Sequence, residues 1–288
     1  MNEVKNKDVY VIKANGEREI FESKKLESSL RRAGTSPKVI TEVVETIKGR
    51  LIDEMTTAEI YREAFRLLKE IEGATIAVKY SVRRAVMELG PDGFSFEDFV
   101  GAMFRAAGYR IRLRQSIKGL CVSHEIDVIA ENEEDFLMAE VKFHNKQGMK
   151  SDLKVILYIK ERFDDITKGE FWNNVKKGLK KNFWLITNTK FTNKAIEYAE
   201  CCPGLKLMSW NYPEGGSLNE FIDNEKLYPL TCLESLSNYD KKLFLKNRVV
   251  LCRELKQGGE RLFNLVGISP EKREAVLQEI ENLLIRHE

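Results

Sequence analysis

Two short stretches decide the fold: HEIDVIA at residues 124–130 and FLMAEVKFH at residues 136–144. Both are dominated by apolar and β-branched residues, and the polar run at 131–135 separates them. This pattern predicts strands over Ile126–Ala130 and Phe136–Phe143, joined by a turn. A short polar turn between two strands makes them antiparallel neighbours in one sheet.

Three charged side chains are brought together by this arrangement. Side chains alternate between the faces of a strand, so Glu140 and Lys142 share a face while Val141 points to the other. Asp127 on the neighbouring strand can join them. Two carboxylates suit Mg²⁺ or Mn²⁺, hard cations that take oxygen ligands and keep several waters. Such an ion can activate a bound water, and Lys142 can orient that water or stabilise the transition state of phosphodiester hydrolysis.

The alternative for this hairpin is a surface element laced with salt bridges, because Glu-x-Lys spacing is common. The apolar residues 136–139 directly before Glu140 argue against it. Carboxylates next to a buried strand are costly unless a cation compensates them. The residues therefore favour a metal site with Asp127 and Glu140 as ligands and Lys142 beside them.

The flanking sequence predicts an α/β layer structure around the hairpin. A helix follows Ser95, its expected N-cap, buries an aromatic-rich face and stops at Gly108. Alternating residues at Tyr109–Leu113 indicate an edge or half-buried strand. Later segments alternate between helix and strand: helix Ser151–Phe163, strand Phe183–Thr187, helix Lys194–Cys201 and strand Leu205–Ser209. The expected fold is a central mixed sheet flanked by helices.

Changes in residue pattern along the chain divide it into three predicted domains. Residues 1–89 open with a hairpin signal around Ala14-Asn15-Gly16 and continue as four helices. The run Gly90–Gly93 is a linker, and the sheet-containing domain covers 94–223. Residues 228–288 form a small helical region with expected helices at Leu230–Leu236, Lys241–Lys246, Val249–Leu255 and Pro270–Leu284, interrupted at Gly258-Gly259 and Gly267.

Composition limits the classes of function. The 288 residues are 43% hydrophobic and 32% charged, with a net charge of only +2. Binding to DNA must therefore rely on local clusters of lysine and arginine. The five cysteines include no CxxC pair, the amino terminus is polar, and no apolar run is long enough to span a membrane. We expect a cytoplasmic protein without a membrane partner.

The middle of the chain resembles a known family. FEDFVGAMFRAAGYRI (96–111), HEIDVIA, FLMAEVKFH and WLITNTKFTNKAIEYAE (184–200) are similar to the PD-(D/E)XK nuclease superfamily, and most to its Mrr-type restriction endonuclease branch. The resemblance covers residues 94–212. It implies a restriction-endonuclease-like fold, Mg²⁺-dependent DNA cleavage, and Glu97 as a further catalytic carboxylate; otherwise Glu97 is a first-turn acid favoured by the helix dipole.

The sequence also departs from the Mrr-type pattern. That branch usually has a glycine-rich stretch before its aspartate and often glutamine at the position of Glu140, whereas this chain has Ser123-His124-Glu125 and a glutamate. This departure affects the prediction of the substrate more than the prediction of metal-dependent phosphodiester hydrolysis.

Basic residues after the site are candidates for DNA contact. Lys146, Lys150 and Lys154 can bind backbone phosphates, and His144 can contact phosphate or assist the metal. The alternatives are a solvated helix face for the lysines and a structural role for His144.

The amino-terminal region has its own resemblance. VYVIKANGEREIFESKKLESSLRRAG (9–34) and AVKYSVRRAV (77–86) look like the start and the closing helix of an ATP cone, the nucleotide-sensing module of ribonucleotide reductases. This implies binding of ATP or dATP and assembly into a homodimer or larger oligomer. A small helical interaction module is the alternative. The candidate nucleotide-binding residues are Val11, Lys13, Arg18, Phe21, Lys24, Lys25, Tyr80 and Arg84.

Together these features predict an Mg²⁺-dependent DNA endonuclease of the restriction, defence or repair type, regulated by ATP or dATP at the amino-terminal cone. The other hypothesis is a nucleotide-responsive DNA-binding regulatory protein whose nuclease fold no longer cuts.

Overall fold

The computed structural model describes residues 9–14 and 16–284. They form two compact units. The first, the cone unit, runs to Val82 and resumes at Gln278, and the second, the sheet unit, spans Arg83–Leu277. Two helices belong partly to each unit: α4 (Ala74–Met87) and α11 (Pro270–Leu284).

The cone unit combines a small sheet with helices, as expected. Strands β1 (Tyr10–Ile12) and β2 (Arg18–Ile20) are antiparallel, and β3 (Met55–Thr56), which the sequence analysis did not predict, pairs in parallel with β1. Asn15 of the predicted turn lies outside the described residues. The helices that precede α4 are α1 (Ser23–Arg32), α2 (Pro37–Arg50) and α3 (Thr57–Ile71).

The helices of the cone unit pack through regularly spaced apolar faces. Leu30, Val43, Ala64 and Leu68 are fully buried at its centre. Helix α3 starts with a capping box in which Thr56 and Glu59 satisfy each other's backbone N–H groups.

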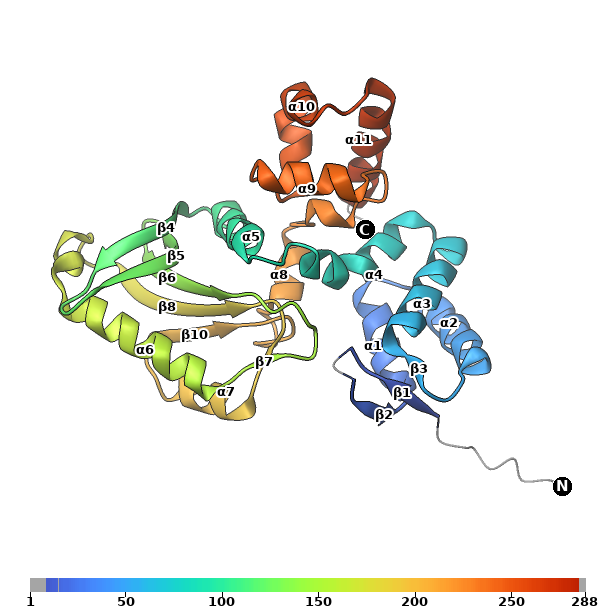
Figure 1. The fold of residues 1–288 in the computed structure, drawn as a ribbon, viewed down its shortest axis with the longest axis horizontal. Helices are drawn as coiled ribbons and strands as arrows, with labels where there is room; N and C mark the ends of the chain where they lie inside the picture. Colours follow the sequence, from blue (N-terminus) through green and yellow to red (C-terminus); the bar gives the residue numbers. More distant parts are fainter. Residues whose placement is uncertain (1–8, 15, 285–288) are drawn as a thin grey trace. The chain divides into compact units, whose positions relative to one another are not determined.

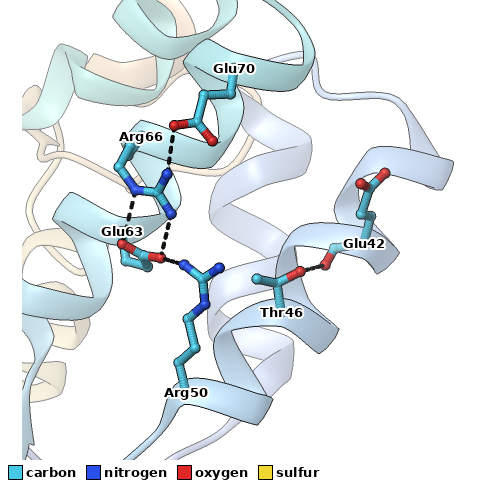
Figure 2. Close-up of polar contacts among 6 residues, drawn as sticks. All are labelled: Glu42, Thr46, Arg50, Glu63, Arg66 and Glu70. Atoms are coloured by element: carbon cyan, nitrogen blue, oxygen red, sulfur yellow. Dashed lines mark hydrogen bonds and ion pairs between the residues drawn. The ribbon is translucent and has the colours of Figure 1, made fainter.

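A chain of ion pairs links α2 to α3 on the outside (Figure 2). Glu63 is held by Arg50 from α2 and by Arg66 from its own helix, and Arg66 also contacts Glu70. Exposed pairs of this kind stabilise by about 0–1 kcal/mol each, so the apolar faces dominate the stability of the unit.

The sheet unit is built on five strands in the order β10-β8-β6-β5-β4. Strands β4, β5 and β6 are antiparallel neighbours, whereas β6, β8 and β10 run parallel. The predicted mixed sheet is therefore confirmed, with β4 at its edge. The bounds are β4 Arg110–Lys118, β5 Ser123–Glu131, β6 Asp135–Lys142, β8 Lys180–Thr187 and β10 Leu205–Met208.

Helices cover both faces of this sheet (Figure 1). Helix α5 (Phe94–Ala106) packs on β4 and β5, and its aromatic-rich face is buried as expected. The other face packs on α6 (Leu153–Lys168) and α7 (Asn193–Glu200) through a core that includes Phe136, Met138 and Phe163. The shorter elements here are β7 (Lys150–Ser151), the 3₁₀ turn η1 (Glu170–Asn174) and β9 (Lys190–Phe191).

One expected helix start was wrong. Gly93, not Ser95, occupies the N-cap of α5, with a left-handed φ of 88°. Asp92 accepts the N–H of Phe94 at 3.1 Å, so a tight turn rather than a capping box starts the helix.

The rest of the chain is helical, as expected. Its elements are α8 (Leu218–Asn224), a 3₁₀ turn at Leu230–Cys232, α9 (Asn238–Lys246), α10 (Cys252–Val266) and α11. The helix predicted at Leu230–Leu236 is only this short turn. Helix α10 is interrupted at Gly259, as expected, and a second helical segment that was not predicted follows the kink and ends at Val266. No helix in the described part of the chain is long and apolar enough to cross a membrane.

We expect Phe163→Ala to destabilise the sheet unit by about 3–5 kcal/mol, because it leaves a cavity between α6 and the sheet. Phe163 is 1% exposed, and its ring stacks on Phe183 at 4.3 Å. Urea unfolding of the full chain measures the loss. Leu157→Ala, at a position 41% exposed on the same helix, is the control and should cost less than about 1 kcal/mol. Equal losses in both variants would contradict this packing.

Candidate active site

Asp127 and Glu140 come level with each other where β5 and β6 stop pairing. The antiparallel register ends at Val128↔Ala139, and one further step along both strands reaches Asp127 and Glu140. The backbone N–H of Val141 donates to Asp127 Oδ2 at 2.7 Å instead of to a strand partner. The side chain of Asp127 thus takes over a backbone hydrogen bond, which fixes its carboxylate at the point where the strands separate.

The sheet is also distorted on the other side of Asp127, opposite Arg114. Pairing between β4 and β5 skips from Leu113↔Val128 to Gln115↔Ile126, and Arg114 has a left-handed φ of 52°. Such a conformation is strained for a residue with a Cβ and is found at functional sites. As a result Leu113 and Arg114 both reach α5, although successive side chains normally alternate.

Arg114 binds two carboxylates of α5. Its guanidinium lies 3.0 Å from Glu97 and 2.6 Å from Asp98. Burial raises the pKa of Glu97, and the negative charge of Asp127 contributes to that rise. Glu97 therefore interacts electrostatically with Asp127, while its hydrogen bond goes to Arg114, and its catalytic role stays a prediction.

A second arginine holds Glu140. Arg162 on α6 places Nη1 2.8 Å from Glu140 Oε2, and its Nη2 donates to the carbonyl of Glu125. Glu140 Oε2 is buried, and Arg162 is its charged partner.

Burial and mutual repulsion make both central carboxyl groups hard to ionise. Burial, reinforced by the charge of Glu140, raises the pKa of Asp127 to about 7. Burial also raises the pKa of Glu140, against the opposing effect of Arg162. Asp127 has no ion-pair partner within the described ranges, so it is the carboxylate that most needs a cation.

The remaining residues predicted here fall into two groups. Lys142 is exposed and close enough to Glu140 to favour its ionised form, and it makes no ion pair inside residues 16–284. His144 is fixed elsewhere: Nε2 hydrogen-bonds Ser151 Oγ at 3.0 Å, and Asn188 clamps its backbone N–H and carbonyl. The geometry favours the structural interpretation of His144.

The three predicted phosphate-binding lysines are all exposed. Lys146 follows β6, Lys150 starts β7 and Lys154 lies in the first turn of α6. They therefore come from one continuous segment of the chain, and each ammonium is accessible to an anion.

The side chains of the site determine whether it can hold a divalent cation. Among the described residues, no group of three or more His, Cys, Asp or Glu side chains forms a ready metal cage. Mg²⁺, however, is commonly bound through one or two carboxylates, with waters completing its shell. Asp127 and Glu140 supply two carboxylates, of which Asp127 has no ion-pair partner among the described residues and Glu140 is paired with Arg162. The residues fit an Mg²⁺ ion held in that way.

In the cone unit, the structure gathers only some of the predicted nucleotide-binding residues. Lys13 and Lys25 both contact Glu19 Oε2, at 2.8 and 3.1 Å. Arg18 instead pairs with Asp53 at 3.2 Å and lies over the ring of Tyr10.

The other predicted members have packing roles or point to solvent. Val11 is buried, and Phe21 and Tyr80 pack against the core. Lys24 is exposed, and Arg84 pairs with Glu88 on the same helix at 2.9 Å. Lys13 and Lys25 are thus the pair of cations that the fold places together.

Two regions of the chain match known protein families. Residues 9–88 match the ATP cone domain, a nucleotide-binding domain, and this confirms the amino-terminal prediction. Residues 228–284 match the domain described as AF1548-like, C-terminal.

Relatives extend this assignment beyond the two domains. An uncharacterized protein of Archaeoglobus fulgidus is 32% identical over 180 residues, which cover 62% of this chain and 95% of that protein. The crystal structure of AF1548, a protein of unknown function, is similar with 30% identity and a TM-score of 0.54, over 66% of this chain and 97% of that one. The chain therefore belongs to the AF1548-like family and carries an ATP cone.

A more distant similarity concerns the restriction endonuclease MspJI in complex with a 27-mer oligonucleotide. It has 11% identity and a TM-score of 0.32, over 71% of this chain and 40% of MspJI. That similarity is too low to support a conclusion. The comparisons thus show the AF1548-like family and the ATP cone, and the resemblance to the Mrr-type branch stays a prediction.

Sequence reasoning missed the two arginines of the site. Arg162 lies at the margin of the apolar stripe of α6, next to the buried Phe163, and a charge at such a margin was the available signal. Arg114 was indistinguishable from Arg110 and Arg112 in an alternating strand, because its left-handed backbone leaves no mark in the sequence.

The raised pKa of Asp127 predicts a pH-dependent cost to folding. The folded state holds the proton more tightly than the unfolded chain, so this contribution to stability is lost as pH rises toward 7. We expect Asp127→Asn to be more stable than the wild type at pH 8 in EDTA, and the gain to shrink by about 2 kcal/mol at pH 5.

Urea unfolding at the two pH values provides the measurement. Glu133→Gln removes an exposed carboxylate in the β5–β6 turn and should change stability equally at both. A pH-independent effect of Asp127→Asn would show that its carboxyl group is not perturbed by the fold.

Proposed function

We propose that the protein is an Mg²⁺-dependent DNA endonuclease of restriction, defence or repair type, regulated by ATP or dATP. One observation carries the nuclease assignment: Asp127 and Glu140 lie level where β5 and β6 separate, and Asp127 has no ion-pair partner among the described residues. Two partly desolvated carboxylates at one position are unfavourable unless a cation binds between them.

In this proposal each side chain has a separate task. Asp127 and Glu140 hold the metal ion, which activates water and polarises the phosphate when bound. Lys142 is exposed and without an ion pair in the described structure, so its ammonium is free to approach an anionic transition state. Glu97 keeps Arg114 in place at 3.0 Å and adds negative charge near Asp127.

Binding of DNA is assigned to the exposed lysines 146, 150 and 154. A phosphate contact by each would give affinity that falls with salt and does not depend on base sequence. The specificity of cleavage must then come from other contacts, because lysine contacts to phosphate carry no sequence information.

We expect the wild type to nick supercoiled plasmid in the presence of Mg²⁺, and Asp127→Ala and Lys142→Ala to lose at least about 100-fold in rate. Loss of a ligand removes the metal, whereas loss of the ammonium removes charge stabilisation at the phosphate. Lys168→Ala, a lysine at the far end of α6, is the matched control and should cut normally. Undiminished nicking by the Asp127 and Lys142 variants would rule out this site.

Regulation is assigned to the cone through Lys13 and Lys25. Their shared partner Glu19 holds two ammonium groups within 3.1 Å of one carboxylate oxygen, an arrangement that a phosphate group can replace. A nucleotide bound there alters cleavage only if the cutting and non-cutting states differ in their affinity for it.

Lys13→Ala and Lys25→Ala should each weaken ATP or dATP binding about tenfold, as expected for loss of one charge-assisted phosphate contact. Titration calorimetry of the full chain measures this. Lys48→Ala, which removes a lysine paired with Glu45 on α2, leaves the affinity unchanged. Wild-type affinity in the Lys13 and Lys25 double variant would place the nucleotide elsewhere.

The second candidate is a nucleotide-responsive DNA-binding regulator without nuclease activity. One observation favours it: Arg114 and Arg162 already form ion pairs with Glu97, Asp98 and Glu140, so part of the negative charge is compensated without a metal. If calorimetry finds no binding of Mg²⁺ or Mn²⁺ to the wild type, this candidate replaces the nuclease.

A further inference from the structure

Arg162 lies in the candidate site, but the proposed function gives it no role. Its side chain extends from α6 to the carboxy-terminal end of β6, where Nη1 lies 2.8 Å from Glu140 Oε2. Its other terminal nitrogen donates to the carbonyl of Glu125, two residues before Asp127, and its guanidinium lies 5.5 Å from the centre of the Tyr158 ring. Three separate contacts therefore fix one charged group beside both carboxylates.

The ion pair is only weakly screened by solvent. The side chains of Arg162 and Glu140 are 13% and 19% exposed, so most of their surface is out of water. A charge contact at this distance is several-fold stronger in such surroundings than on an open surface. Arg162 is consequently the main compensation for the negative charge of Glu140.

This compensation conflicts with the task proposed for Glu140. Arg162 contacts the buried oxygen Oε2 of Glu140, which is one of the two oxygens that this carboxylate can offer to a metal ion. A divalent cation bound to that atom would meet a fixed positive charge at close range. A cation bound through Oε2 therefore competes with Arg162 for that oxygen, and a cation bound through the other oxygen of the carboxylate is still repelled by the guanidinium.

We propose that Arg162 is a built-in competitor for the divalent cation: it holds Glu140 when no metal is bound and must yield that carboxylate for a metal to bind. The inference rests on the proposed metal site and adds a residue that sets the metal affinity. It makes Arg162 a positioning residue for Glu140, distinct from Lys142, which is exposed and holds no carboxylate.

The test is Mn²⁺ binding to the full chain, measured by electron paramagnetic resonance and calorimetry at fixed pH. Arg162→Met should bind Mn²⁺ at least about tenfold more tightly than the wild type, because a fixed positive charge is removed. Arg162→Lys keeps a charge and should change the affinity less than about threefold. Lys160→Met is the matched control: it removes a cation from the same helix that pairs with Asp164, and it should bind as the wild type does.

A second measurement does not depend on the folding of the Met variant. In wild-type protein labelled with ¹⁵N-arginine, the Nε–H signal of Arg162, assigned by its absence in Arg162→Lys, should shift saturably with Mg²⁺. The shift should vanish in Glu140→Gln. A signal that stays unchanged while Mg²⁺ binds overturns the inference, as does unaltered or weaker Mn²⁺ binding by a folded Arg162→Met variant.

Failure of this inference is distinguishable from failure of the proposed function. Plasmid nicking with no Arg162 effect on metal affinity leaves the nuclease standing and removes the competitor. Tighter Mn²⁺ binding by Arg162→Met, without nicking by any form, supports the competitor and removes the nuclease. Absence of Mn²⁺ and Mg²⁺ binding in every form overturns both.

Discussion

The hydrogen bond from the Val141 N–H to Asp127 Oδ2 is the contact on which the site depends. It forms where the β5–β6 ladder ends, so a side chain substitutes for a backbone acceptor that the separating strand no longer provides. The same contact holds a carboxylate beside Glu140 in a desolvated position. The strands therefore separate at the same point where the two carboxylates come together.

Two arginines partly compensate the clustered negative charge, Arg114 from strand β4 and Arg162 from helix α6. Helix α5 supplies Glu97 and Asp98, which bind Arg114 of β4, and α6 supplies Arg162, which binds Glu140. At an effective dielectric constant near 20, each close pair contributes on the order of 4 kcal/mol of Coulomb energy before desolvation is counted. The helices therefore act as electrostatic supports as well as covers for the apolar core.

Sequence patterns predicted the sheet well because its strands follow simple rules. The apolar runs at 126–130 and 136–143, separated by a polar turn, lie on neighbouring antiparallel strands, and Asp127 and Glu140 do come level. What the sequence could not show depends on backbone conformation and on distant contacts. The left-handed backbone of Arg114 has no local signal in the sequence. The contacts of Arg114, Arg162 and Asn188 join residues that are 16 to 44 positions apart, so neighbouring residues do not predict them.

The arginines do not by themselves decide between a nuclease and an inactive fold. In a nuclease fold that no longer binds metal, the clustered carboxylates only destabilise the protein. Replacing them by apolar residues often stabilises a fold, so a fold without metal has no physical reason to keep them. Here Asp127 remains, with a pKa raised to about 7 and no ion-pair partner among the described residues. An unpaired acid at this position weakens folding near neutral pH unless something binds to it. That residual cost is the physical reason to favour a cation-binding site over a vestigial one.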